Sequence, residues 1–225
     1  MTIAKHWPLL LALLAGTAGA LPAAGRAAET GSVAGTIRLE KAKVVYDGPK
    51  SSRYLVVSLE GPGLDAEPAA DRTETMDQKG LVFIPHVLAL RQGQSVKFLN
   101  SDTDNHNVYF LHDETGETLD IGTWGPGTSV THRFDEPGMF ITLCTLHLEM
   151  AAYILVFPHP YFQVVELDEE TGQAGYQLSG VPPGQYELRV WHKNLKQKKG
   201  PKTIQVTGGE TTVLDDVVTK KKYAK

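Results

Sequence analysis

The sequence has 225 residues and only one cysteine, Cys144. A single cysteine cannot form a disulfide within the chain, so in an exported protein its thiol is free, bonded to another molecule or bound to a metal. Long apolar runs are also missing, since no stretch reaches the ~20 residues that a membrane-spanning helix needs. The formal net charge of −4 disfavours nucleic acid as a partner. The length is sufficient for one or two compact domains.

The N-terminus has the features of an export signal. Lys5 supplies a positive charge, Leu9–Ala15 is apolar, and small residues follow. The alternative is a membrane anchor, but the apolar stretch is short and prolines flank it. We therefore expect residues 1–28 to be a cleaved signal peptide. The mature chain is then periplasmic or otherwise extracytoplasmic, with no membrane span.

Glycine and proline are frequent and separate short stretches in which apolar and polar residues alternate. Val33–Leu39, Ser129–Phe134 and Tyr186–Trp191 are examples, and no stretch shows the period of a helix. This pattern predicts an all-β protein. Between Leu81 and Phe157, about six or seven short strands indicate a sandwich or a barrel. Residues 65–78 show no apolar period, and we expect a linker there.

The stretch Cys144–Met150 lies between two apolar runs that we expect to be strands. It carries a thiolate, the His147 imidazole and the Met150 thioether within one short loop. His106, in a polar loop before another expected strand, is the candidate for a second imidazole. One soft thiolate, two imidazoles and a weak thioether suit both oxidation states of copper. The residues therefore suggest a copper site made by His106, Cys144, His147 and Met150.

Each of these residues also has a simpler explanation. A buried free cysteine is usually a small hydrophobe, and a methionine before a strand usually belongs to the core. Zinc is a second metal that cysteine and histidine bind. From the residues alone, copper, zinc and a purely structural role stay open. If the site exists, we expect the side chain of Asn107 to hydrogen-bond the backbone of the Cys144 loop and join the two ligand loops.

The stretch from Met76 to Phe157 resembles the cupredoxins, most of all the amicyanin and plastocyanin branch. The resemblance rests on the following residues and spacings: Phe83-x-Pro85, Gly93-x-x-Val96-x-Phe98, His106-Asn107-Val108, Pro137-Gly138 leading into Cys144, and Cys-x-x-His-x-x-Met. It implies a Greek-key β-sandwich that binds copper. By this resemblance His106, Cys144 and His147 are the equatorial ligands and Met150 is the axial ligand.

The ligand loop departs from amicyanin at two positions. Leu146 and Leu148 flank His147, where amicyanin has prolines. The rigidity of the loop, and with it the reduction potential, is therefore open. By the same resemblance His86 lies along the side of the barrel as a surface strand residue, whereas Met76 and Gln78 lie nearer the copper and line its mouth.

The remainder of the chain resembles a second family. The phrase Val181-Pro-Pro-Gly184-Gln-Tyr186-x-Leu188-x-Val190 is typical of carboxypeptidase-regulatory-like, transthyretin-type β-sandwiches. We expect residues 29–70 and 158–220 to be the two halves of such a sandwich, with residues 71–157 inserted as the cupredoxin domain. The layout also resembles plastocyanin-like "methylamine utilization" proteins, a label that does not establish a role.

These expectations favour a type 1 copper protein that carries single electrons to and from unidentified redox partner proteins. The alternatives are a copper-handling or sensing protein and a non-redox binding module. A copper enzyme is disfavoured because the sequence lacks the paired His-x-His segments of multicopper oxidases, and because Met150 would occupy the position that catalysis needs open.

Overall fold

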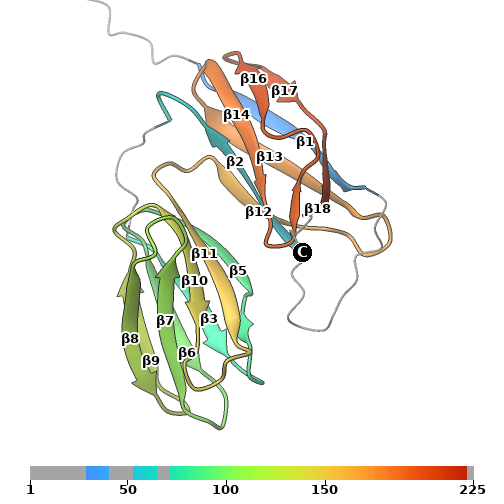
Figure 1. Cartoon of the computed structure of the whole chain (residues 1–225). Coiled ribbons are helices and arrows are strands. Elements are labelled where there is room, and N and C mark those ends of the chain that lie inside the picture. The colour runs from blue at the N-terminus through green and yellow to red at the C-terminus, as the bar shows by residue number, and fades with distance from the viewer. Residues whose placement is uncertain (1–28, 41–52, 65–70, 222–225) are drawn as a thin grey trace, which may run out of the picture.

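The computed structural model describes residues 29–40, 53–64 and 71–221. The strands form four sheets, which make up the two bodies visible in Figure 1. The described residues contain strands and no helix, so the all-β prediction is confirmed. No helix that could cross a membrane therefore occurs within these ranges. The predicted signal peptide, residues 1–28, lies outside them.

The lower body in Figure 1 is a sandwich of two sheets whose strand orders are β5-β11-β10-β7-β8 and β4-β3-β6-β9. Within it, β3 pairs parallel with β6 and β5 pairs parallel with β11, whereas the other pairs are antiparallel. Its core contains the rings of Phe98, Phe110 and Phe134. The strands are β3 (Thr73–Gln78), β4 (Phe83–Ile84), β5 (Val87–Arg91), β6 (Ser95–Asn100), β7 (His106–His112), β8 (Thr118–Trp124), β9 (Ser129–Arg133), β10 (Gly138–Leu143) and β11 (Ala151–Phe157).

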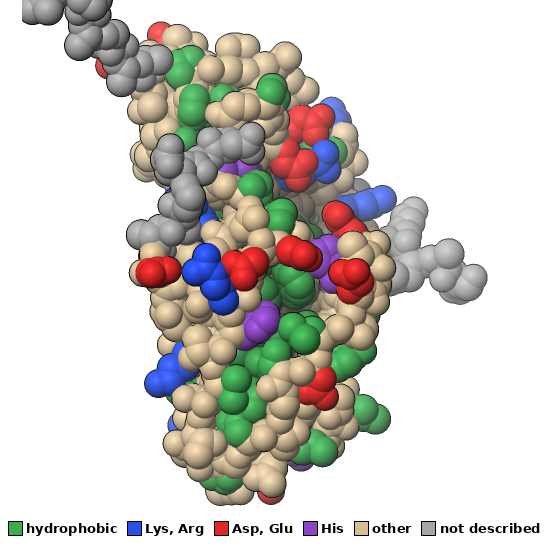
Figure 2. Space-filling model, turned by 90° about the vertical axis from the view of Figure 1, so that its left-hand side faces the viewer, with side chains coloured by type: hydrophobic (Ala, Val, Ile, Leu, Met, Phe, Trp, Pro, Cys, Tyr) green, Lys and Arg blue, Asp and Glu red, His purple; other side chains and the backbone are tan. Residues whose placement is uncertain are grey.

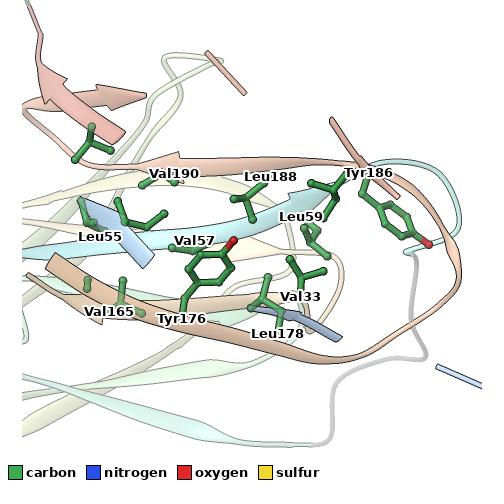
Figure 3. Packing of buried hydrophobic residues seen from close by; sticks show 14 of the residues in the cluster. Val33, Leu55, Val57, Leu59, Val165, Tyr176, Leu178, Tyr186, Leu188 and Val190 are labelled. Carbon is green, nitrogen blue, oxygen red and sulfur yellow. The ribbon is translucent and has the colours of Figure 1, made fainter. Parts of the chain in front are cut away.

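The upper body is a second sandwich, with sheets ordered β13-β1-β18-β15 and β12-β2-β14-β16, and with β17 paired to β1. Figure 3 shows its core, where side chains from both sheets meet. Two of its strands precede the lower sandwich in sequence and the others follow it. The strands are β1 (Gly31–Leu39), β2 (Tyr54–Glu60), β12 (Phe162–Glu166), β13 (Gln173–Val181), β14 (Gly184–Trp191), β15 (Leu195–Gln197), β16 (Lys202–Val206), β17 (Thr211–Val213) and β18 (Asp216–Lys220).

Two strands are buried on both faces, which explains their nearly continuous apolar sequences. In β2, Leu55 and Val57 point into the core of the upper sandwich, whereas Val56 belongs to a separate cluster with Leu155. In β11, Ile154 points into the core of the lower sandwich, and Leu155 points the other way. The cluster around Val56 and Leu155 therefore lies between the two sandwiches and holds them together by apolar burial.

A groove of about 590 Å³ lies at this boundary. Figure 2 shows the hollow between the two halves, with hydrophobic side chains inside and acidic groups around it. Met139, Phe157 and Trp191 line the groove and also pack in the boundary cluster, so its floor is continuous with that cluster.

The linker expected at residues 65–78 is wrong for its C-terminal part, because Thr73–Gln78 forms strand β3. Only Met76 and Gln78 of β3 are buried, so the strand has no apolar period to reveal it. Residues 65–70 lie outside the described part of the chain. Strand β8 was not predicted either, because it is an edge strand whose residues are mostly exposed.

Candidate metal centre

The ligand loop joins two paired strands of the lower sandwich. Strand β10 ends at Leu143, Cys144 follows directly, and β11 begins at Ala151. The backbone N–H of Met150 donates to the His147 carbonyl at 2.9 Å, and the N–H of Cys144 donates to the Met150 carbonyl at 3.4 Å. These two bonds fold the loop back on itself, as expected for a hairpin tip that gathers side chains at one point.

His106 reaches the same point from strand β7, which pairs antiparallel with β10. It is the first residue of β7 and lies opposite Trp124 of β8. Both ligand-bearing turns lie at the lower end of this sandwich in Figure 1. The imidazole of His106 has no exposed surface, and Cys144 is 2% exposed, so the two side chains meet inside the protein.

The three donor atoms form a compact triangle. The Sγ of Cys144 lies 4.0 Å from the Nδ1 of His106 and 3.8 Å from the Nδ1 of His147, and the two nitrogens are 3.1 Å apart. The point equidistant from these three atoms is about 2.1 Å from each, close to the roughly 2.0–2.3 Å bonds that first-row metal ions form with imidazole nitrogen and thiolate sulfur. The donor set therefore fits one such ion without rearrangement. This is the one group of three or more His, Cys, Asp or Glu residues with metal-binding spacing among the described residues.

Asn107 connects the two ligand loops. Its backbone N–H donates to the Cys144 Sγ at 3.4 Å, and its side-chain Oδ1 accepts a hydrogen bond from the Thr145 N–H at 3.2 Å. Its Nδ2 donates to Asp120 Oδ1 and to the Gly122 carbonyl. The predicted bond between the Asn107 side chain and the Cys144 loop is confirmed. A backbone N–H directed at the sulfur stabilises the thiolate form that binds metal.

The far side of the His106 ring faces a carboxylate. Its Nε2 lies 3.1 Å from Asp102 Oδ2, which also accepts a hydrogen bond from the Leu81 N–H at 3.0 Å. The Leu81 N–H, with smaller help from the N–H of Thr103, holds the pKa of Asp102 below its ordinary value. Asp102 was not among the predicted site residues. The available signal was a carboxylate in the turn four residues before a candidate histidine ligand.

The remaining loop residues differ in exposure. Met150 is 1% exposed and packs in the same core cluster as Cys144. His147 is half-buried, and on either side of it Leu146 is 52% exposed and Leu148 is 89% exposed. The site thus has a buried sulfur and one imidazole that approaches the surface between two exposed leucines.

His86 is not a surface strand residue, contrary to the prediction. Its ring lies 5.5 Å from the Tyr153 ring, and its Nε2 is buried with no hydrogen-bond partner among the described residues. Burial, together with a smaller contribution from the charge of Lys193 in the upper sandwich, lowers the pKa of His86 to about 4. His86 thus lies at the boundary between the sandwiches. It is absent from the three-residue group at the site.

Met76 and Gln78 do not line a solvent-facing mouth, because neither has any exposed surface. Met76 packs in the core of the lower sandwich. The Nε2 of Gln78 donates to the Leu99 carbonyl. Both side chains therefore pack in the interior of the lower sandwich, beneath the turn that carries Asp102.

Residues 70–157 match the sequence profile of a family described as copper binding proteins, plastocyanin/azurin family. The resemblance of this part of the chain to the cupredoxins is thus confirmed by a family match. Copper is accordingly the cofactor of the site, and the Cys144, His106 and His147 donors are of the kind a blue copper centre uses. The match spans the lower sandwich and leaves the upper one without a family assignment.

Solved structures similar to the cupredoxin domain include copper proteins. A reduced amicyanin variant is 25% identical over 39% of this chain and 85% of its own, with a TM-score of 0.36. Amicyanin from Paracoccus versutus is 19% identical over 40% of this chain and 84% of its own, with a TM-score of 0.35. A copper-containing nitrite reductase from Thermus scotoductus is 22% identical over 44% of this chain and 25% of its own, with a TM-score of 0.36.

Proposed function

We propose that the protein is an extracytoplasmic blue copper protein that carries single electrons. The observation that supports this most is the triangle of Cys144 Sγ, His106 Nδ1 and His147 Nδ1, with sides of 4.0, 3.8 and 3.1 Å. A soft thiolate combined with two imidazoles is a compromise between the preferences of cuprous and cupric ions. Copper, when bound, supplies the one-electron couple.

The chain contributes a donor set that is already in place. Two loop-closing backbone bonds, the Asn107 side chain and the pairing of β7 with β10 fix the positions of His106 and Cys144. A rigid site exchanges electrons with little rearrangement of its ligands. Met150, buried beside Cys144, is the axial ligand in this proposal. A weak thioether there leaves the three equatorial donors to dominate the coordination.

The surface around His147 suits a partner protein. Leu146 and Leu148 are among the large apolar side chains that the described residues leave exposed, and both adjoin the imidazole closest to solvent. A partner that covers them would bring its own redox centre against His147 and exclude water from the contact. We infer that the partner is a redox protein, and that neither nucleic acid nor substrate chemistry is involved.

A copper-handling role is the main alternative. A protein that passes copper on needs a thiolate that the recipient can reach, whereas the Cys144 side chain is 2% exposed. The purified copper-loaded protein distinguishes the two roles. A carrier shows intense visible absorption from thiolate-to-copper charge transfer and a reversible one-electron titration. A colourless protein that loses copper to a thiol competitor within minutes would contradict the proposal.

The proposal also includes where the protein is located and how its chain is divided into domains. The export features of residues 1–28 support secretion, which fractionation of cells expressing the full chain would test. For the upper sandwich, we propose that residues 29–70 and 158–220 form a transthyretin-type domain interrupted by the cupredoxin. The pairing of β2 with β12 and β14, and of β1 with β13, β17 and β18, supports this plan.

A further inference from the structure

We propose that Asp102 is a positioning residue that lowers the reduction potential of the copper site through His106. This inference rests on the proposed function and deepens it. The Nδ1 of His106 faces Cys144 and His147, and its Nε2 lies 3.1 Å from Asp102 Oδ2, so the carboxylate favours a proton on Nε2. The imidazole is thus held between the donor triangle and a carboxylate.

The carboxylate is fixed from several directions. Its Oδ2 accepts a second bond from the Leu81 N–H, and its Oδ1 accepts one from the Thr103 N–H at 3.0 Å. The backbone N–H of Asp102 donates to Asn100 Oδ1 at 3.0 Å. Asn100, which is 1% exposed, donates in turn to the carbonyls of Asp104 and Trp124. The position of Asp102 is therefore set by the β6–β7 turn and by the β3–β4 turn together.

The β3–β4 turn adopts an unusual backbone conformation to make this contact. Leu81 has a φ of 59°, and it is the one residue other than glycine with a positive φ in the described part of the chain. Leucine rarely adopts this conformation, and such outliers persist where the surroundings enforce them. Here the conformation accompanies the bond from the Leu81 N–H to the carboxylate that faces His106.

The negative charge of Asp102 is directed at the site. Within the described ranges, its ion pairs include only His106, and no lysine or arginine neutralises it. A carboxylate on the outer nitrogen of a ligand histidine makes the inner nitrogen a stronger donor. A nearby negative charge also stabilises the higher charge of cupric ion. Both effects favour the oxidised form, so Asp102 lowers the potential and keeps His106 in the metal-binding tautomer.

The test replaces Asp102 by asparagine, which keeps the shape and an acceptor oxygen but removes the charge. Asp102→Asn is expected to keep the charge-transfer absorption and bind one copper. Its ratio of cuprous to cupric protein in a fixed redox buffer should rise by roughly a hundredfold, from the Coulomb energy between the Asp102 charge and an ion about 6 Å away at an effective dielectric constant of about 20. The control is Asp104→Asn, which removes an exposed carboxylate from the same turn. A shift no larger than that of the control overturns the tuning role.

The metal-free protein gives an independent measurement. Nitrogen-15 NMR of the unaltered apoprotein should show a slowly exchanging proton on Nε2 of His106, and Asp102→Asn should speed its exchange while Asp104→Asn leaves it unchanged. Fast exchange in the unaltered protein would show that Asp102 does not hold the ring. If the loaded protein lacks the charge-transfer absorption, the proposed function fails, whereas this measurement still decides whether Asp102 positions His106.

Discussion

Asn107 Oδ1 accepts a hydrogen bond from the Thr145 N–H at 3.2 Å, and this bond ties the loop that carries His106 to the loop that carries Cys144. The residues are 38 positions apart in sequence, yet the bond lies immediately beside two of the metal donors. The separation between those donors therefore depends on an amide side chain as well as on the pairing of β7 with β10.

Asn107→Ala should loosen the site and weaken the fold together. It leaves the Thr145 N–H and the Gly122 carbonyl without their partner, at a cost of about 2–3 kcal/mol in the free energy of unfolding. Copper affinity should fall by roughly 10–100-fold, since the loops no longer hold the donors in register. Chemical denaturation and copper competition measure the two effects. Asn105→Ala, at an exposed neighbouring position, is the control, and equal losses in both variants would contradict the bridging role.

Cys144→Ser should abolish the visible absorption while the protein stays folded. A hydroxyl has nearly the shape of a thiol, but it lacks the soft sulfur that gives charge transfer to copper. The absorption spectrum after copper addition measures the first effect, and circular dichroism confirms that the strands are intact. Persistence of the colour would mean that Cys144 is not a copper ligand.

Met150→Gln should retain copper and lower the reduction potential. An amide oxygen is a harder donor than a thioether and stabilises the cupric state. Potentiometric titration of the variant gives the shift, with Leu148→Gln as the control on the exposed side of the same loop. A potential equal to that of the unaltered protein would show that Met150 is not the axial ligand.

The sequence predicted that Cys144 and His147 lie together because they are three positions apart in one loop. The spacing of Cys144, His147 and Met150 is local, and a loop between two strands can close only a few ways. The predicted role of Asn107 followed because it adjoins His106. Asp102 could not be predicted in the same way. Asp102 lies only four residues before His106, but its second bond comes from the unusual backbone of Leu81, in a turn about 20 residues earlier, which no local pattern reveals.

The missed strands have a different cause. Both β3 and β8 leave many of their side chains in solvent, so neither shows the apolar alternation from which strands are predicted.

The boundary between the sandwiches could not be predicted from the sequence either. Val56 and Leu155 belong to apolar runs that predict strands. Only the structure shows that these two side chains pack between the two sandwiches.

His86→Phe should reduce the pH dependence of stability between about pH 6.5 and pH 4. Burial, with a smaller contribution from Lys193, lowers the pKa of His86 to about 4, so the folded protein holds this ring neutral where an unfolded chain would protonate it. Above the unfolded pKa of about 6.5 the ring is neutral in both the folded and the unfolded protein, so its titration does not change the free energy of unfolding. As pH falls towards 4, proton uptake by the unfolded state removes stability, on the order of 2 kcal/mol with solvent screening included.

The measurement compares urea denaturation of the apoprotein and of the variant at pH 7, 5.5 and 4.5. The difference between the two pH profiles measures the loss of His86 together with its charge interaction with His192. Phenylalanine keeps a ring against Tyr153 and removes the buried Nε2 that has no partner among the described residues. The variant should therefore lose less stability on acidification than the unaltered protein. Parallel profiles would mean that burial at the sandwich boundary does not lower the pKa of His86.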